Sequence, residues 1–256
     1  MKIQFIGTGS GKASLKRFHS SLLITSGGYN LLIDCGDGIS KALLYNSIEF
    51  NSIEGILITH FHPDHYSGIA ALLVQMKLTG RTSSLAVFVH QSNLEYLQRF
   101  IYQSYIFIER LGFELRFIPF TEDELVRIND SLVLLTKQNS HLAAYKGFDR
   151  NNELSFSCSS IMFEEGNKTV LFTGDIGDKE DLFLFNNKKI DLLISEVSHV
   201  EIADILKAFR SQKISGLYLT HISDDDDSKL EKLYASIFDN EKKIIAAAFE
   251  GLIINL

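Results

Sequence analysis

The sequence is poor in several features that would place the chain in a special class. Two cysteines in 256 residues cannot build a disulfide scaffold, so a reducing compartment, the cytoplasm, is expected. No stretch approaches the roughly 18 consecutive apolar residues of a membrane-spanning helix. The start of the sequence also lacks the long apolar stretch of a signal peptide. We therefore expect no membrane partner.

The composition is otherwise that of an ordinary globular protein. No linker or low-complexity tract divides the chain, and 45% of its residues are hydrophobic. At this length one large domain is the first expectation. The net charge of −7 argues against bulk, sequence-independent binding of nucleic acid.

A faint internal repeat links the two halves of the sequence. Residues 55–60 read GILITH and residues 216–221 read GLYLTH, while residues 31–36 and 171–176 form a second, weaker pair. Each is an apolar run, typical of a buried strand, that ends at a polar side chain. We predict an α/β fold in a single domain, 1–256, with two pseudo-repeated halves whose sheets pack face to face between helical layers.

Two further segments have a readable pattern. The stretch from Ser67 to Leu78 carries apolar residues at helical spacing, which predicts a helix with one buried face. Residues 243–256 predict a final pair of strands. The apolar residues of the helical stripe are Ile69, Leu72, Leu73 and Met76.

Residues 60–65 read HFHPDH and place three imidazoles and a carboxylate at the end of an apolar strand. Imidazole nitrogen and carboxylate oxygen are ligands suited to Zn²⁺, Mn²⁺ or Fe²⁺. A histidine-rich surface loop is the alternative. The density of ligand-type side chains favours a metal site.

With its context, this motif resembles the signature of the metallo-β-lactamase superfamily, and the resemblance extends along almost the whole chain. The order and strand-end setting of four other residues match the remaining motifs of that superfamily. These are Asp34 in LLIDCGDG, His141 in QNSHLAAY, Asp175 in LFTGDIGD and His221 in LYLTHIS.

The resemblance implies a four-layer αβ/βα sandwich and a metal-dependent hydrolase with two divalent ions. Zinc is the expected metal, with manganese or iron as alternatives. A metal-bridged hydroxide would be the nucleophile, and Asp64 would orient it or accept its proton. Asp34 would support the ligand histidines, or else serve only as a turn residue. In the implied ligand set, His60, His62 and His141 hold one ion, Asp64, His65 and His221 hold the other, and Asp175 bridges both.

The start of the chain resembles the ribonuclease Z and phosphodiesterase branch of the superfamily. Residues 7–24, GTGSGKASLKRFHSSLLI, have the glycine turn, basic loop and Ser-Ser strand of that branch. Lys12, Lys16 and Arg17 are therefore candidate contacts for a substrate phosphate. A solvated basic loop is the alternative.

Residues 190–223 resemble a shortened ribonuclease Z region that contains a His-Glu-Ala-Thr motif. Glu196 matches the glutamate of that motif, and His199 matches a histidine assigned to proton transfer, whereas Ser195 replaces the motif's own histidine. Glu196 and His199 are thus candidate catalytic residues. A histidine at a helix start is the alternative for His199.

One departure from ribonuclease Z concerns the segment between His141 and Asp175, which is too short for the basic arm that grips transfer RNA. We therefore predict a phosphodiesterase for a small anionic or phosphodiester substrate. The first alternative is a hydrolase of a carboxylic ester, thioester or lactone on the same site. A tRNA 3′-processing endonuclease and a non-catalytic or redox di-metal protein are less favoured, and a homodimer is left open.

Overall fold

A computed structural model of the chain describes residues 1–256, apart from the side chain of Asp227. The chain divides into two compact units, which are described separately. Unit 1 comprises residues 1–8, 17–121 and 250–256, and unit 2 comprises residues 9–16 and 122–249.

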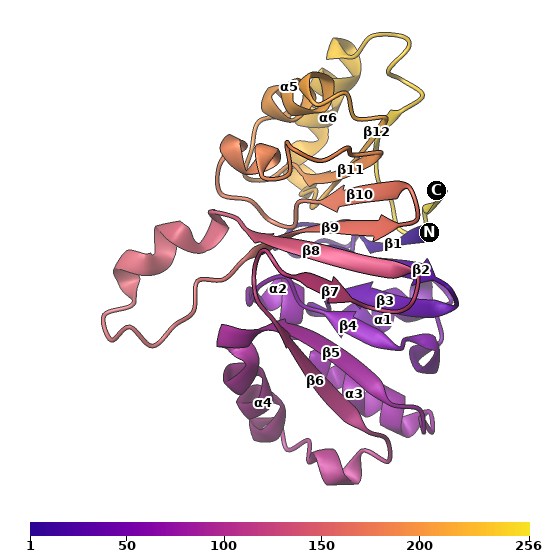
Figure 1. Ribbon diagram of the computed structural model, residues 1–256, viewed down its shortest axis with the longest axis vertical. Coiled ribbons are helices and arrows are strands. Elements are labelled where there is room, and N and C mark those ends of the chain that lie inside the picture. Colours follow the sequence, from indigo (N-terminus) through magenta and orange to yellow (C-terminus); the bar gives the residue numbers. More distant parts are fainter. The chain divides into compact units, whose positions relative to one another are not determined.

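Unit 1 contains a mixed sheet with the strand order β14-β1-β2-β3-β4-β5-β6 (Figure 1). The strands from β14 to β3 pair antiparallel, and those from β3 to β6 pair parallel. The bounds are β1 Lys2–Gly7, β2 Ser21–Ser26, β3 Tyr29–Ile33, β4 Gly55–Leu57, β5 Leu85–His90, β6 Leu115–Phe120 and β14 Ile253–Asn255.

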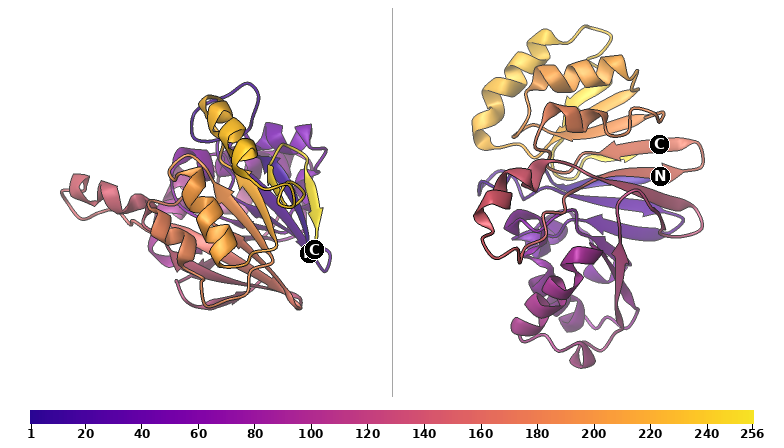
Figure 2. Two further views of the ribbon diagram at one scale, coloured as in Figure 1. Left: turned by 90° about the horizontal axis from the view of Figure 1, so that it is seen from above. Right: turned by 60° about the vertical axis from the view of Figure 1, so that its left-hand side comes forward.

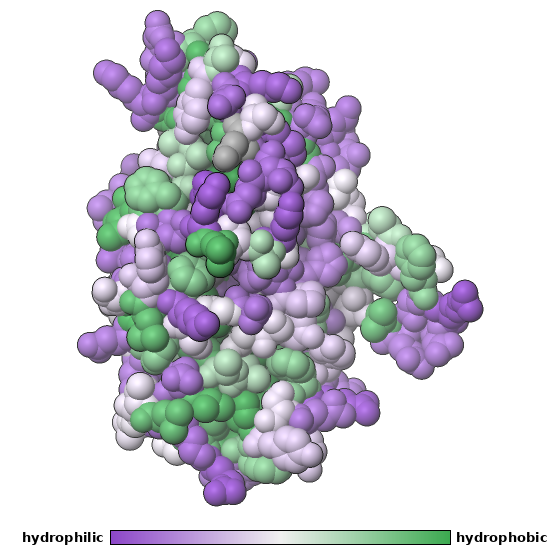
Figure 3. Space-filling view, turned by 180° about the vertical axis from the view of Figure 1, so that it is seen from behind, coloured by the Kyte–Doolittle hydropathy of each residue, from purple (hydrophilic) through white to green (hydrophobic). Residues whose placement is uncertain are grey.

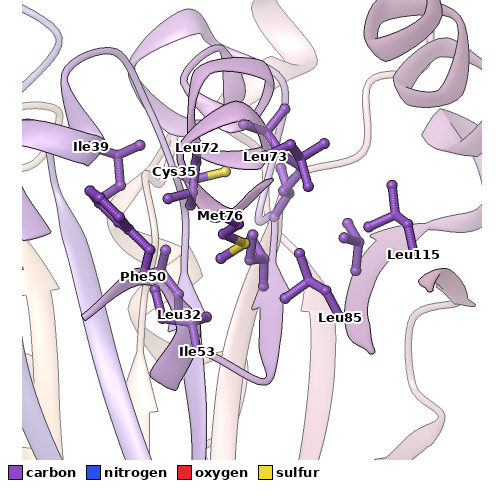
Figure 4. Close-up of a cluster of buried hydrophobic side chains, with 14 of the residues drawn as sticks. Leu32, Cys35, Ile39, Phe50, Ile53, Leu72, Leu73, Met76, Leu85 and Leu115 are labelled. Atoms are coloured by element: carbon purple, nitrogen blue, oxygen red, sulfur yellow. The ribbon is translucent and has the colours of Figure 1, made fainter. Parts of the chain in front are cut away.

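The helices of unit 1 pack their apolar faces on this sheet. In α3 the four residues of the expected stripe are fully buried, which confirms that prediction. Figure 4 shows this cluster, in which α3 side chains meet Leu32 and Leu85 from the sheet and Ile39 from α1. The helices are α1 Ile39–Tyr45, α2 Pro63–Tyr66, α3 Ile69–Leu78 and α4 Leu94–Gln103, with short 3-10 turns η1 Phe50–Ser52, η2 Gln91–Asn93 and η3 Ile108–Arg110.

Unit 2 repeats the same plan with the order β13-β12-β11-β10-β9-β8-β7. The strands from β7 to β10 pair antiparallel, and those from β10 to β13 pair parallel. The shared plan agrees with the faint sequence repeat. The bounds are β7 Leu125–Arg127, β8 Leu132–Gln138, β9 Ser159–Glu165, β10 Lys168–Phe172, β11 Leu192–Glu196, β12 Gly216–Thr220 and β13 Ile245–Ala247.

The helices α5 and α6 lie together against the sheet of unit 2 (Figure 2). Ile205 and Phe209 of α5 and Leu233 of α6 are buried in its core. The segment between β8 and β9 projects from this sheet, and its surface in Figure 3 is a mixture of green apolar and purple polar areas. The elements are η4 His141–Phe148, η5 Lys179–Phe183, α5 Ile202–Ser211, η6 Asp224–Asp226 and α6 Asp227–Ser236.

The last two strands differ from the simplest form of the sequence prediction. Residues 243–256 do contain two strands, but β13 pairs with β12 in unit 2 and β14 pairs with β1 in unit 1. The N- and C-terminal strands are therefore neighbours (Figure 1). Within the described part of the chain, no helix is both long enough and apolar enough to cross a membrane.

The fold places several of the predicted site residues at the carboxyl ends of the parallel strands. In unit 1, Asp34 follows β3 and His60 lies just beyond β4, while in unit 2 Glu196 ends β11 and His221 follows β12. In open α/β sheets, ligands bind outside the carboxyl ends of the strands. Each sheet thus presents polar residues at its own carboxyl edge.

Candidate metal centre

The HFHPDH motif of unit 1 occupies the turn from β4 into α2. Pro63 is the first residue of α2, where its missing N–H costs no helical hydrogen bond. Asp64 and His65 are the second and third residues of this single-turn helix. The imidazole rings of His60 and His65 are 4.1 Å apart, and those of His60 and His62 are 4.8 Å apart. One short turn thus gathers all four of the predicted ligands that unit 1 contributes.

Asp34 anchors this turn from the end of β3. Its Oδ2 accepts a hydrogen bond from His65 Nδ1 at 2.7 Å, and its Oδ1 accepts one from the Thr59 amide at 2.8 Å. Burial raises the pKa of the Asp34 carboxyl, and the neighbouring His65 and Thr59 donors oppose that rise. With Nδ1 engaged, Nε2 is the nitrogen through which His65 could bind a metal, and it lies 3.3 Å from Asp64 Oδ2.

Thr59 connects the same carboxylate to His60. Its hydroxyl donates to Asp34 Oδ2 at 2.9 Å and contacts His60 Nδ1 at 3.1 Å. Because the hydroxyl proton is given to Asp34, the His60 contact has Nδ1–H as donor. Nε2 is therefore also the nitrogen through which His60 could bind a metal.

A close backbone approach holds α2 against the β3 turn. The Cys35 amide donates to the His65 carbonyl at 2.8 Å. A Cβ on Gly36 would lie 1.8 Å from the carbonyl oxygen of Asp64, so only glycine fits. Gly36 thus permits the close approach between the turn that follows β3 and helix α2.

Unit 2 brings together the other three predicted ligands. Asp175 Oδ2 lies 3.2 Å from His221 Nε2 and 3.8 Å from His141 Nε2. All three side chains are buried. One oxygen of the Asp175 carboxylate thus lies near two of the imidazoles that the sequence predicts as ligands.

Glu196 and His199 stand beside these ligands in unit 2. Glu196 Oε2 accepts hydrogen bonds from the Ser198 amide at 2.6 Å and the His199 amide at 2.9 Å, and lies 3.4 Å from His199 Nδ1. The His199 ring is 4.6 Å from that of His141 and 5.6 Å from that of His221. One ligand atom from each of Glu196, His199 and His221 lies within 4.8 Å of the others.

The predicted phosphate contacts are in part engaged elsewhere. Lys12 forms an ion pair with Asp225, whose hydrogen bond and charge raise the pKa of the lysine. Arg17 donates to the Thr8 hydroxyl at 2.8 Å. Lys16 is exposed. The loop is thus tied to protein partners at two of its three cations.

Several residues that contact the predicted ligands were not predicted from the sequence. Thr59 precedes His60 at a strand end, and Thr220 precedes His221 in the same way, so the repeat itself was a signal. Asn139 Oδ1 accepts the His141 amide at 3.1 Å, and the Ser198 hydroxyl donates to the His221 carbonyl at 2.7 Å. No local sequence pattern marks Asn139 or Ser198 as such a partner.

Comparison with known proteins identifies the fold. YhfI from Bacillus subtilis, a metallo-β-lactamase fold protein, superposes with a TM-score of 0.75 at 20% identity, covering 99% of each chain. The short form of human tRNase Z gives 0.72 at 18% identity, covering 100% of this chain and 99% of that one. A ribonuclease Z of Saccharolobus islandicus is 27% identical over 263 residues, 87% of this chain and 89% of that protein.

These similarities confirm the predicted α/β metallo-β-lactamase fold and the class of metal-dependent hydrolase in the ribonuclease Z and phosphodiesterase branch. Within that class, the sequence profile described as "Anti-Pycsar protein Apyc1" matches residues 1–232. The chain belongs to that family.

Proposed function

We propose that the chain hydrolyses phosphodiesters with two divalent metal ions. The observation that carries this proposal is the Glu196–His199 pair beside His221. His199 is the partly exposed member, with 37% of its side chain accessible, and its Nδ1 faces a buried carboxylate. Such a pair supplies a proton to a poor leaving group. An alkoxide that leaves from phosphorus is such a group and requires this proton.

The donor set fits metal ions of the zinc type. His60 and His65 each have Nδ1 held by a protein partner, which fixes the ring and makes Nε2 the nitrogen that would face a metal. Bound divalent ions supply a nucleophilic water at neutral pH and neutralise charge that develops on the phosphoryl oxygens. By the superfamily pattern, His60, His62 and His141 would hold one ion, Asp64, His65 and His221 would hold the other, and Asp175 would be a ligand to both.

Three side chains of the chain itself carry the proton movements. Asp64, with 14% of its side chain exposed, orients the attacking water and accepts its proton. His199 donates a proton to the leaving oxygen. Glu196 holds His199 in place and stabilises its protonated form.

The substrate is proposed to be a small anionic phosphodiester. The net charge of −7 disfavours a long polyanion away from the metals. The projecting segment between β8 and β9 offers only Lys146 and Arg150 as cations. Processing of transfer RNA is therefore a weaker candidate, although relatives carry the name ribonuclease Z.

One observation favours a second candidate, the hydrolysis of a carboxylic ester, thioester or lactone. Lys12 and Arg17 are engaged with Asp225 and Thr8, which leaves less positive charge for a phosphate. The same ligands and the same water would serve that reaction. Substrate comparison separates the two.

The test is a series of aryl and alkyl phosphodiesters with leaving groups of rising pKa, given to the Zn²⁺- or Mn²⁺-loaded protein. We expect turnover, and we expect His199→Gln to lose roughly 100-fold on the poorest leaving group but little on p-nitrophenol. His90→Gln, at a histidine that caps the turn η2, is the control. No turnover with either metal contradicts the proposal, and an equal loss across the series contradicts the role of His199.

A further inference from the structure

The loop of residues 9–16 is attached to the segment that directly follows His221. Gly9 and Ile222 form a parallel β-bridge, and the Ser10 amide donates to the Ile222 carbonyl at 3.3 Å. More than 200 residues of sequence separate the two segments, yet both belong to unit 2. The contact therefore joins the start of the chain to the residue that directly follows His221.

Two side chains extend this attachment along the acidic run that follows. Lys12 forms the ion pair with Asp225, and the Ser14 hydroxyl donates to Asp224 Oδ1 at 2.9 Å. The Lys12 and Asp225 side chains are 62% and 74% exposed, so their attraction is weakened by solvent. Together with the backbone bridge, however, the contacts act on one short segment.

The backbone conformation of His221 indicates what this attachment does. His221 has a φ of 55°, a left-handed conformation that is unfavourable for any residue with a Cβ. Such a conformation persists only where neighbouring contacts hold it. The Ser198 hydroxyl holds the His221 carbonyl at 2.7 Å, and the loop holds the next residue, Ile222.

We propose that the loop of residues 9–16 is a clasp that positions His221 for metal binding, with Lys12 and Ser14 as its positioning residues. The cation of Lys12 then serves the backbone geometry of a ligand rather than a substrate phosphate. This inference rests on the proposed function, because it takes His221 as a ligand.

A charge-swap series on the full chain tests the clasp. The variants are Lys12→Asp, Asp225→Lys and the double variant, and the readouts are Zn²⁺ affinity by competition with a chromophoric chelator and hydrogen exchange of residues 216–226 in the metal-free protein. We expect each single variant to bind Zn²⁺ about two- to fivefold more weakly and to exchange faster. We expect the double variant to recover both.

Lys242→Asp is the matched control, because it removes a similarly exposed ion pair, with Asp239, in the same unit. It should change neither readout. If all variants match the wild type in affinity and exchange, the clasp is contradicted. If Lys12→Asp and the double variant share a raised KM at unchanged Zn²⁺ affinity, Lys12 contacts substrate and the clasp is also contradicted.

The wild-type measurement separates this inference from the proposal beneath it. A wild-type protein that binds no Zn²⁺ contradicts the proposed function itself. If the wild-type protein binds Zn²⁺ and hydrolyses phosphodiesters, and the single variants equal it in Zn²⁺ affinity and hydrogen exchange, the clasp alone is overturned.

Discussion

Oδ2 of Asp34 lies 2.7 Å from Nδ1 of His65, and both side chains are almost wholly buried. The hydrogen bond fixes which imidazole nitrogen faces the proposed metal. Asp34 itself has a φ of 60°, a left-handed conformation that is unfavourable for a residue with a Cβ. Positioning this carboxylate therefore costs conformational energy.

Replacing Asp34 should weaken metal binding more than it weakens the fold. In Asp34→Asn an amide N–H would face a hydrogen-bond donor, so we expect Zn²⁺ affinity to fall about 10- to 100-fold. Chelator competition measures it. Asp37→Asn, at an exposed position in the same turn, should leave the affinity unchanged.

Thr59 should be sensitive to loss of its hydroxyl and tolerant of loss of its methyl. Thr59→Val leaves a buried Asp34 oxygen and His60 Nδ1 without this partner, so we expect a loss of about 1–3 kcal/mol in the free energy of unfolding. Thr59→Ser keeps the hydroxyl and should recover most of it. Urea unfolding of the metal-free protein measures both losses. Equal losses for Thr59→Val and Thr59→Ser would argue against the role of the hydroxyl.

Gly36 should not accept a side chain. The Cβ of Gly36→Ala would meet the Asp64 carbonyl oxygen at 1.8 Å, so α2 must shift. We expect a loss of about 1–3 kcal/mol in unfolding free energy together with weaker Zn²⁺ binding. Gly147→Ala, where a Cβ would meet nothing within 4 Å, is the control and should change neither.

We expect the stability of the fold to depend on pH through Glu122, which is not among the predicted metal ligands. Burial raises the pKa of this carboxyl, although the Ser159 hydroxyl donates to it at 2.7 Å. A carboxyl whose pKa is raised in the folded state favours folding when protonated, and this contribution is lost as the pH rises through that pKa. Glu122→Gln should therefore gain thermal stability over wild type at neutral pH.

That gain should shrink as the pH is lowered, because the wild-type carboxyl then takes up its proton. Thermal unfolding from neutral to acidic pH measures the difference. Glu124→Gln, at an exposed neighbour, should show no such trend. A gain that stays constant with pH would contradict the assignment to Glu122.

Local sequence patterns predicted the parts of the fold that local physics determines. The stripe from Ile69 to Met76 is buried because helical spacing alone puts those residues on one face. His60 was predicted as a ligand from the local HFHPDH motif, whereas His221 was predicted only from the resemblance to the superfamily over the whole chain; both lie just beyond a buried strand. The helical stripe and the HFHPDH motif are local information, and the assignment of His221 is not.

Contacts between distant segments could not be read in this way. Nothing local to Lys12 indicates Asp225 as its partner, and nothing in residues 243–256 indicates that β14 pairs with β1. The left-handed backbone of Asp34 and His221 is equally hidden, because neither is a glycine. These features depend on tertiary contacts that override local preference.

The measurement that tests the central claim most directly compares substrates on one metal-loaded preparation. We predict that kcat/KM for a small phosphodiester exceeds that for a neutral lactone and for a thioester, and that chelation of the metal abolishes it. A preparation that binds metal yet cleaves the lactone or thioester efficiently and leaves the phosphodiester intact would contradict the account.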